Sequence, residues 1–405
     1  MGSEKFPKEN DFDQFIKNRN GFDNAMTECE HTIFYFKIGE EHLAGALDRF
    51  SQFFIAPLMS IDSMEREMEA VESEFQNDIN SDIYRINQLF ASMVRQEHPA
   101  ANFTWGNLKT LKDGIKKEDL HSIVHEFRRK FYKSNRMNLC IQSSLEIDEA
   151  EKMVMNYFGD VKPEYGTILK TISVDPFVDV FKTDFYNKVF YVKSKAKKRK
   201  MFVTFLIPSK DIDYRNKSLE YLAFLINYEG RDSLTSYFKK SALALNVSAK
   251  IGSRNFEGNS MFTFFTIEVS LTRYGYEEIA RVVDAIFSFL FIIKMTPMEE
   301  HKEIFIEFKE IRDTLFNYRN EKSSFENVQD LALNMRYFKD EDIIVGKEIC
   351  PEFDEGILKN LIEKINEKRF NLIILSDNFP KYNKVEKWFG TEYAEIGNIC
   401  ATFRG

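Results

Sequence analysis

The spacing of apolar residues along this 405-residue chain alternates between a helical period and a strand period. Apolar positions three and four residues apart predict amphipathic helices, and short β-branched and aromatic runs predict strands. Helices are expected near 41–55, 61–80, 82–95, 117–132, 147–158, 217–227, 232–241, 275–294, 298–319, 324–336 and 354–367, with a last one before Trp388. Strands are expected at 33–38, 138–143, 188–192, 201–207, 246–251, 261–271 and 370–376, with 188–192 paired to 201–207. The pattern predicts an α+β fold of mostly antiparallel sheets packed with helices.

A repeat divides this pattern into two halves. The segments RMNLCIQS at 136–143 and RFNLIILS at 369–376 agree at five of eight positions. Each is followed by a predicted helix that ends in Phe-Gly, so we interpret the repeat as a duplication. A stretch with proline and glycine at 163–176 is expected to be a linker. We therefore predict a first domain over 1–170 and a homologous second domain over 171–405.

Composition excludes several classes of function. The net charge of -8 and a pI near 5.6 disfavour a general nucleic-acid binder, and no apolar run approaches the length of a membrane span. The four cysteines are scattered without metal-ligand spacing, which fits a reducing compartment. The opening MGSEKFPKEN carries no secretory signal. A cytoplasmic protein without nucleic-acid or membrane partners is the expectation.

The stretch REMEAVESEF at 66–75 places acidic residues beside a predicted core. Glu67 and Glu74 lie two helical turns apart. They share one flank of the apolar stripe instead of the outer face with Glu65, Glu69 and Glu72. One interpretation is a solvated helix edge, with Arg66 and Arg85 as ion-pair partners. The other is metal or proton chemistry, because a carboxylate beside a core costs free energy unless a cation or hydrogen bonds offset that cost. The pattern leaves both open.

Three further motifs have ordinary structural interpretations. His121 and His125 share a helix face, but a metalloprotease helix would place its glutamate between them. We expect exposed histidines above a core of Leu120, Ile123, Val124 and Phe127. The basic run at 195–200 is expected to be a charged hairpin loop instead of a localisation signal or anion patch. YEGRDSL at 228–234 is explained by helix capping.

Six segments together carry a resemblance that spans nearly the whole chain. They are MGSEKFPKENDFDQFI, GFDNAMTECEHTIFYF, EREMEAVESEFQND, HPAANFTWGNLKTLK, NYEGRDSL and EKWFGTEY. In order and spacing the chain resembles the nardilysin and insulin-degrading enzyme family of pitrilysin-type inverzincin metallopeptidases. FTWGNLKTLK and the opening segment point toward the nardilysin branch. The departures are small: Glu72 stands where an Asp is common, and Asp232 where a second Gly is usual.

The resemblance implies a fold, a cofactor and a substrate. Four α+β domains of this kind form two bowl-shaped halves that close around a peptide, and this chain corresponds to the N-terminal half. Glu74 takes the role of a zinc ligand and Glu67 that of a supporting acid in catalysis. Asn24, Ala25, Met26 and Thr27 match an edge strand that binds an extended peptide. Without the resemblance, an ordinary edge strand explains these four residues equally well.

One family motif is absent from these 405 residues. The H-x-x-E-H motif, which supplies two histidine ligands and the general base, does not occur in them. A chain with one ligand should not hold catalytic zinc alone. We therefore expect the N-terminal half of a nardilysin-like zinc metalloendopeptidase whose first domain lacks the N-terminal segment that carries this motif, so that the chain is inactive by itself. A C-terminal half or another chain is a candidate partner. The alternative is a non-catalytic peptide-binding or regulatory pseudopeptidase that pairs with another chain.

Overall fold

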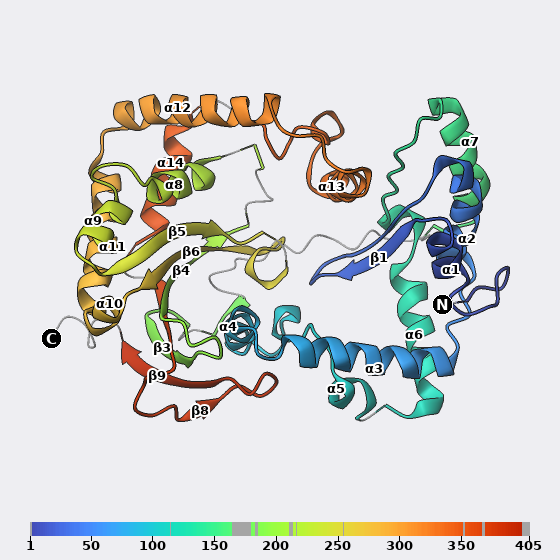
Figure 1. The fold of residues 1–405 in the computed structure, drawn as a ribbon, viewed down its shortest axis with the longest axis horizontal. Coiled ribbons are helices and arrows are strands. Elements are labelled where there is room, and N and C mark those ends of the chain that lie inside the picture. Colours follow the sequence, from blue (N-terminus) through green and yellow to red (C-terminus); the bar gives the residue numbers. More distant parts are fainter. Residues whose placement is uncertain are drawn as a thin grey trace. The chain divides into compact units, whose positions relative to one another are not determined.

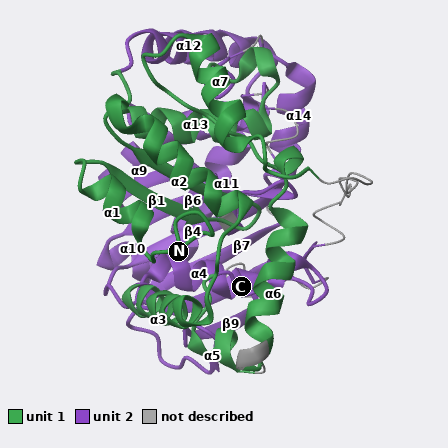
Figure 2. Cartoon of the chain, turned by 90° about the vertical axis from the view of Figure 1, so that its right-hand side faces the viewer, with its two compact units in different colours: residues 1–77, 105–171, 320–345 green, residues 78–104, 172–319, 346–405 purple. Residues whose placement is uncertain are grey.

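The chain folds into two compact units, each assembled from three separate segments (Figure 2). Unit 1 comprises Met1–Asn77, Trp105–Thr171 and Asn320–Val345, and unit 2 comprises Asp78–Thr104, Ile172–Arg319 and Gly346–Gly405. This computed structural model describes residues 2–113, 115–163, 180–182, 185–209, 214–215, 217–253, 255–350, 353–366 and 369–398. The expected linker at 163–176 lies almost wholly outside the described residues. The division into homologous domains at residue 170 stays a prediction.

Unit 1 is built around an antiparallel hairpin of β1 (Phe22–Thr27) and β2 (Thr32–Lys37). On one face, Phe34 and Phe36 pack against the core of α1 (Asp11–Lys17) and α2 (Leu43–Ile55). On the other face lies α13 (Ser324–Tyr337), whose Phe325 ring stacks at 5.9 Å from the ring of Tyr35. The hairpin therefore lies between helices that are far apart in the sequence.

The other α-helices of unit 1 are α3 (Ile61–Asp78), α5 (Leu108–Lys112), α6 (Lys117–Phe131) and α7 (Ile147–Phe158), labelled in Figure 1 where room allows. Its described 3-10 helices are η1 (Glu40–His42), η3 (Ser134–Arg136) and η7 (Asp340–Asp342). The apolar spacing predicted α3, α6 and α7 but not α5. Met68 and Phe75 are the buried residues of α3, which confirms the predicted stripe. Gly159 caps α7, as the sequence indicated.

Unit 2 contains a seven-stranded sheet in the order β5-β6-β4-β7-β3-β9-β8. Its strands are β3 (Lys188–Lys193), β4 (Lys200–Pro208), β5 (Ala244–Ile251), β6 (Phe262–Leu271), β7 (Phe370–Ser376), β8 (Lys384–Val385) and β9 (Glu392–Asn398). Neighbouring strands run antiparallel except β3 and β7. Every residue of the central strand β7 is buried, as expected for a strand covered on both faces.

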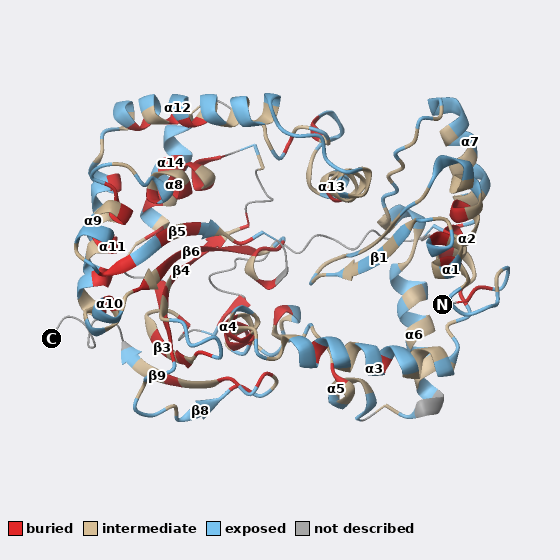
Figure 3. Ribbon diagram, in the orientation of Figure 1, coloured by how far each residue is buried: buried red, intermediate tan, exposed pale blue. Residues whose placement is uncertain are grey.

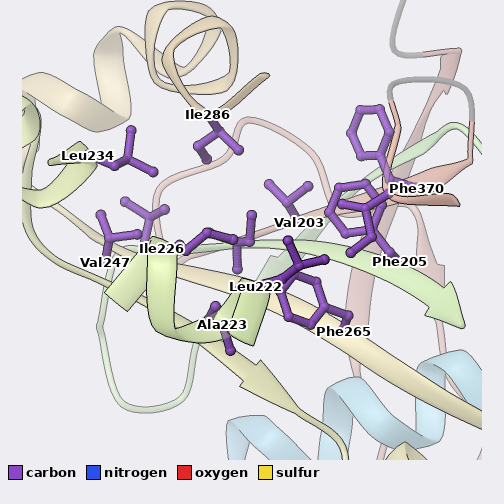
Figure 4. Close-up of a cluster of buried hydrophobic side chains, with 14 of the residues drawn as sticks. Val203, Phe205, Leu222, Ala223, Ile226, Leu234, Val247, Phe265, Ile286 and Phe370 are labelled. Carbon is purple, nitrogen blue, oxygen red and sulfur yellow. The ribbon is translucent and has the colours of Figure 1, made fainter. Parts of the chain in front are cut away.

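Helices cover both faces of this sheet. One face packs against α8 (Ser218–Asn227), α9 (Leu234–Lys240), α11 (Ile279–Met295), α12 (Met298–Asn317) and α14 (Glu355–Lys364). Figure 4 draws part of this hydrophobic cluster, including residues of α8, α9 and α11. The short α10 (Arg273–Glu277) precedes α11. The other face packs against α4 (Asp82–Ala91) and the segment around Phe181. Because alternate strand residues enter alternate clusters, strands β4 and β6 are buried almost throughout (Figure 3).

The predicted α+β class with mostly antiparallel sheets is confirmed, but three local predictions are wrong. The strands at 188–192 and 201–207 are not partners, since β7 lies between them. Residues 138–143 form no strand, and no helix precedes Trp388. The apolar spacing also missed β9. None of the described helices is long and apolar enough to cross a membrane.

Glu268 on β6 joins three strands of the sheet through two lysines. Its carboxylate accepts hydrogen bonds from Lys200 on β4 and Lys250 on β5. Burial tends to raise the pKa of Glu268, but the two lysines outweigh burial and leave this pKa below its usual value. The carboxylate therefore stabilises the folded state only where it is ionised.

We expect Glu268→Gln to lower the free energy of unfolding by about 1 kcal/mol at pH 7, because a charge-assisted pair is lost. This decrease should have its full size above the pKa of Glu268 in the unfolded chain, about 4.3. It should become smaller as the pH falls through the lower pKa of Glu268 in the folded protein. Urea denaturation of both proteins at pH 7 and pH 3 measures it. An equal difference at both pH values would contradict this assignment.

Candidate active site

The acidic helix α3 presents Glu67 and Glu74 to solvent, each directly before one of the buried residues Met68 and Phe75. Seven residues of helix separate the two carboxylates by about 10 Å along the axis. Neither carboxylate hydrogen-bonds or pairs with any other residue in the described part of the chain. Both are thus available to an external cation or ligand, and their roles stay predictions.

The two arginines considered as partners of these acids lie elsewhere. The Arg66 guanidinium binds Glu9, and its Nε donates to a Glu9 oxygen at 3.3 Å. Arg85 binds the Asp82 carboxylate at 3.0 Å and the Lys193 carbonyl at 2.8 Å. Ion pairing by these arginines therefore does not explain Glu67 or Glu74.

Two other acids on α3 have a structural role that the sequence pattern missed. Glu69 binds Lys112 at 2.7 Å, and Glu72 accepts the Leu108 N–H at 2.7 Å. This main-chain hydrogen bond, with one from the Gln76 side chain, lowers the pKa of Glu72. Glu69 and Glu72 therefore hold α5 against α3, and Glu72 does not stand free on the outer face. The signal available in sequence was the N-cap Asn107, which starts α5.

The hairpin leaves one edge of β1 without a neighbouring strand among the described residues. In register with the strand pairs, the Glu28 N–H donates to the His31 carbonyl at 2.9 Å. Hydrogen-bonded pairs alternate along an antiparallel ladder. The main-chain groups of Asp23, Ala25 and Thr27 therefore point away from β2, and a second extended chain could pair with them.

Asn24 covers part of this free edge. Its side-chain oxygen accepts the Ala25 N–H at 2.9 Å, so the donor is satisfied locally. At the far end of the hairpin, Arg336 of α13 donates to the Glu30 carbonyl at 2.9 Å and fixes the turn to the helix. The candidate strand of Asn24, Ala25, Met26 and Thr27 is thus exposed along one edge and anchored at its end.

The remaining motifs form structure of ordinary kinds. The basic run leads from β3 to β4 across β7, so it is not a hairpin loop as predicted. Ser233 caps α9 by accepting the Ser236 N–H at 3.0 Å, which confirms the capping interpretation. Asp232 adopts the left-handed conformation with φ of 65°, which aspartate tolerates better than most residues.

The histidine pair on α6 differs from its expected setting. Ile123 and Phe127 are 47% and 56% exposed, so the predicted core beneath the histidines is wrong. His121 and His125 are half-buried, and their facing Nε2 atoms lie 3.1 Å apart. Burial, then the neighbouring His121 and Arg128, hold the pKa of His125 below its usual value.

Three family models match successive parts of this chain. Residues 1–97 match "Insulinase (Peptidase family M16)", and residues 120–303 match "Peptidase M16 inactive domain". Residues 316–397 match "Middle or third domain of peptidase_M16". The segments with β1 and α3 therefore fall in the first of these models.

Individual relatives agree with these models. Rat nardilysin is 36% identical over 97% of this chain and 34% of its own length. Human insulin-degrading enzyme is 29% identical over 98% of this chain and 38% of its own length. The crystal structure of pitrilysin superposes with a TM-score of 0.88 at 25% identity, covering 98% of this chain and 41% of that chain.

The chain thus spans about a third of the length of the curated relatives that it matches. The three family-model matches, the alignments over nearly the whole chain and the shared fold agree with one another. The chain belongs to peptidase family M16, with nardilysin and insulin-degrading enzyme among its relatives.

Proposed function

We propose that this chain is the N-terminal half of a nardilysin-like zinc metalloendopeptidase, in which Glu74 binds the metal and Glu67 supports it. The observation that carries this proposal is the pair of solvent-facing carboxylates on α3, without partners in the described part of the chain. Other acids on the same helix, Glu69 and Glu72, are occupied by contacts to α5. The free pair coincides with the two positions that the family resemblance assigns.

The described residues fit zinc only in part. A carboxylate such as Glu74 is a suitable ligand, but no group of three potential ligands gathers anywhere in the described residues. The 405 residues contain no H-x-x-E-H motif. Bound zinc would supply a water activated for attack on a peptide bond. We propose that these 405 residues alone contribute one ligand and are inactive.

The free edge of β1 is the proposed peptide site. Asp23, Ala25 and Thr27 direct their main-chain groups outward, so an extended peptide can add as a third strand. The Asn24 amide must release the Ala25 N–H before a peptide can accept that hydrogen bond. Asn24 therefore makes the empty edge less prone to pair with unrelated strands.

Ala25→Pro should weaken peptide binding about five- to tenfold, since proline removes one outward N–H donor worth roughly 1 kcal/mol. Ala25→Ser keeps the N–H and should bind as the parent does. Fluorescence anisotropy with a labelled extended peptide measures both, and circular dichroism checks the fold. Equal affinity in the proline and serine variants would place the peptide elsewhere.

A second candidate function is a non-catalytic peptide-binding or regulatory protein that pairs with another chain. It rests on the same β1 edge and on the absence of the H-x-x-E-H motif from these residues. We propose a C-terminal half or another chain as the partner in either candidate. Cys140 and Cys350 are unbridged thiols, which supports a reducing, cytoplasmic location.

The experiment that tests the proposal is to purify the natural gene product and measure its mass, its zinc and its peptide hydrolysis. A product longer than this chain, with one tightly held zinc and chelator-sensitive hydrolysis, is the expected result. A natural product of 405 residues that binds peptide without zinc or hydrolysis would favour the second candidate.

A further inference from the structure

The histidine pair on α6 has a geometry that the proposed peptidase does not use. His121 and His125 lie one helical turn apart, with ring centroids separated by 4.3 Å and ring planes at 52°. Their Nε2 atoms face each other at 3.1 Å. Both side chains are half-buried, so one side of the pair is open to solvent.

The distance between the two Nε2 atoms matches that between two imidazole nitrogens bound to one metal ion. Two imidazole nitrogens, each about 2.0–2.1 Å from one ion, lie about 3.3 Å apart at the tetrahedral angle and about 2.9 Å at a right angle. The observed 3.1 Å falls between these values. The nitrogen separation therefore suits two imidazoles that bind one cation.

Two arginines lie near the pair. The Arg128 guanidinium donates hydrogen bonds to the carbonyls of Phe54 and Ile55, at 2.8 and 2.7 Å. Arg128 and Arg129 still carry positive charge near His125, which weakens cation binding.

We propose that His121 and His125 form a two-histidine site for a borderline divalent transition-metal ion such as Zn²⁺, Ni²⁺ or Cu²⁺. No third histidine, cysteine or acid joins the pair among the described residues, so the pair itself supplies two ligands. Imidazole selects these ions over Mg²⁺ and Ca²⁺. The site is independent of the peptidase proposal, since it includes neither Glu67 nor Glu74.

The test is calorimetric titration of the metal-free 405-residue chain with Ni²⁺ and, separately, with Zn²⁺ and Mg²⁺. We expect one Ni²⁺ or Zn²⁺ per chain and no heat from Mg²⁺. His121→Gln and His125→Gln should each weaken binding at least about tenfold, since one imidazole cannot chelate. His42→Gln removes a histidine outside the pair and should bind as the parent does.

Two further measurements separate this site from loss of fold and from the peptidase site. The metal-free variants should melt at the parent temperature, and Ni²⁺ should raise the melting temperature of the parent only. Glu74→Gln should bind Ni²⁺ normally. Unchanged binding in both histidine variants would overturn the proposal and leave an ordinary hydrogen bond between the rings. Binding lost in Glu74→Gln would also overturn it.

Discussion

Glu74→Gln should remove the tightly held zinc, as distinct from an ion at His121 and His125, from any protein that joins these 405 residues to a segment carrying the family's H-x-x-E-H motif. Mutating residues that merely orient metal ligands costs about 10- to 100-fold in affinity, so loss of a ligand should cost more than about 100-fold. A neutral amide also lacks the charge that offsets the cation. Peptide hydrolysis should fall by a similar factor, because it depends on the bound metal.

The controls for this prediction lie on the same helix. Glu69→Gln removes an equally exposed acid that binds Lys112, so zinc content should stay at the parent level. Glu67→Gln should lower activity more than zinc content, since Glu67 is proposed to support and not to bind. Zinc by mass spectrometry and hydrolysis of a fluorogenic peptide measure these effects. Full zinc in Glu74→Gln would remove Glu74 from the metal site.

Asp82→Ala should lower the free energy of unfolding of unit 2 by about 3–5 kcal/mol, because it leaves the buried Arg85 without a negatively charged partner. Arg85 is fully buried, and its Nε and Nη2 find no partner in the described structure. Its cationic group therefore relies on the Asp82 carboxylate and one carbonyl. The Asp82 carboxylate also fixes the start of the basic run, through Ser194 Oγ at 2.8 Å and the Lys195 N–H at 2.8 Å.

A matched control is Glu355→Ala, which breaks an exposed ion pair with Lys359 on α14. Such pairs contribute about 0.5 kcal/mol or less, so this variant should unfold near the parent midpoint. Denaturant titration, followed by tryptophan fluorescence and circular dichroism, measures both variants. A loss below about 1 kcal/mol in Asp82→Ala would mean that Arg85 reaches water or another acceptor when the carboxylate is removed.

Sequence reasoning succeeded where the signal is local. The stripe of α3 and the apolar run of β7 follow directly from residue spacing, and Ser233 was a recognisable cap. Strand pairing is not local, so the partners of β3 and β4 could not be inferred from their order in the chain. Residues 138–143 have strand-like composition, yet a strand exists only where a neighbour supplies hydrogen bonds.

In the candidate site, too, local features could be predicted and contacts between distant residues could not. Periodicity placed Glu67 and Glu74 beside the apolar stripe, and family resemblance assigned their roles. The hydrogen bond that Glu72 accepts from the Leu108 N–H could not be predicted, because Leu108 lies on a different helix. The same holds for Asn24, whose amide covers the Ala25 N–H only in the folded hairpin geometry.

The parallel pairing of β3 with β7 has a consequence for synthesis on the ribosome. Tyr191 pairs with Ile374, so the centre of the sheet in unit 2 stays open until translation has passed the second of these residues. At about 5–20 residues per second, that interval lasts roughly 10–40 s. During it, the largely apolar strand β4 presents an unpaired edge toward the place of β7. The nascent chain should therefore depend on chaperones during that interval more than the finished protein does.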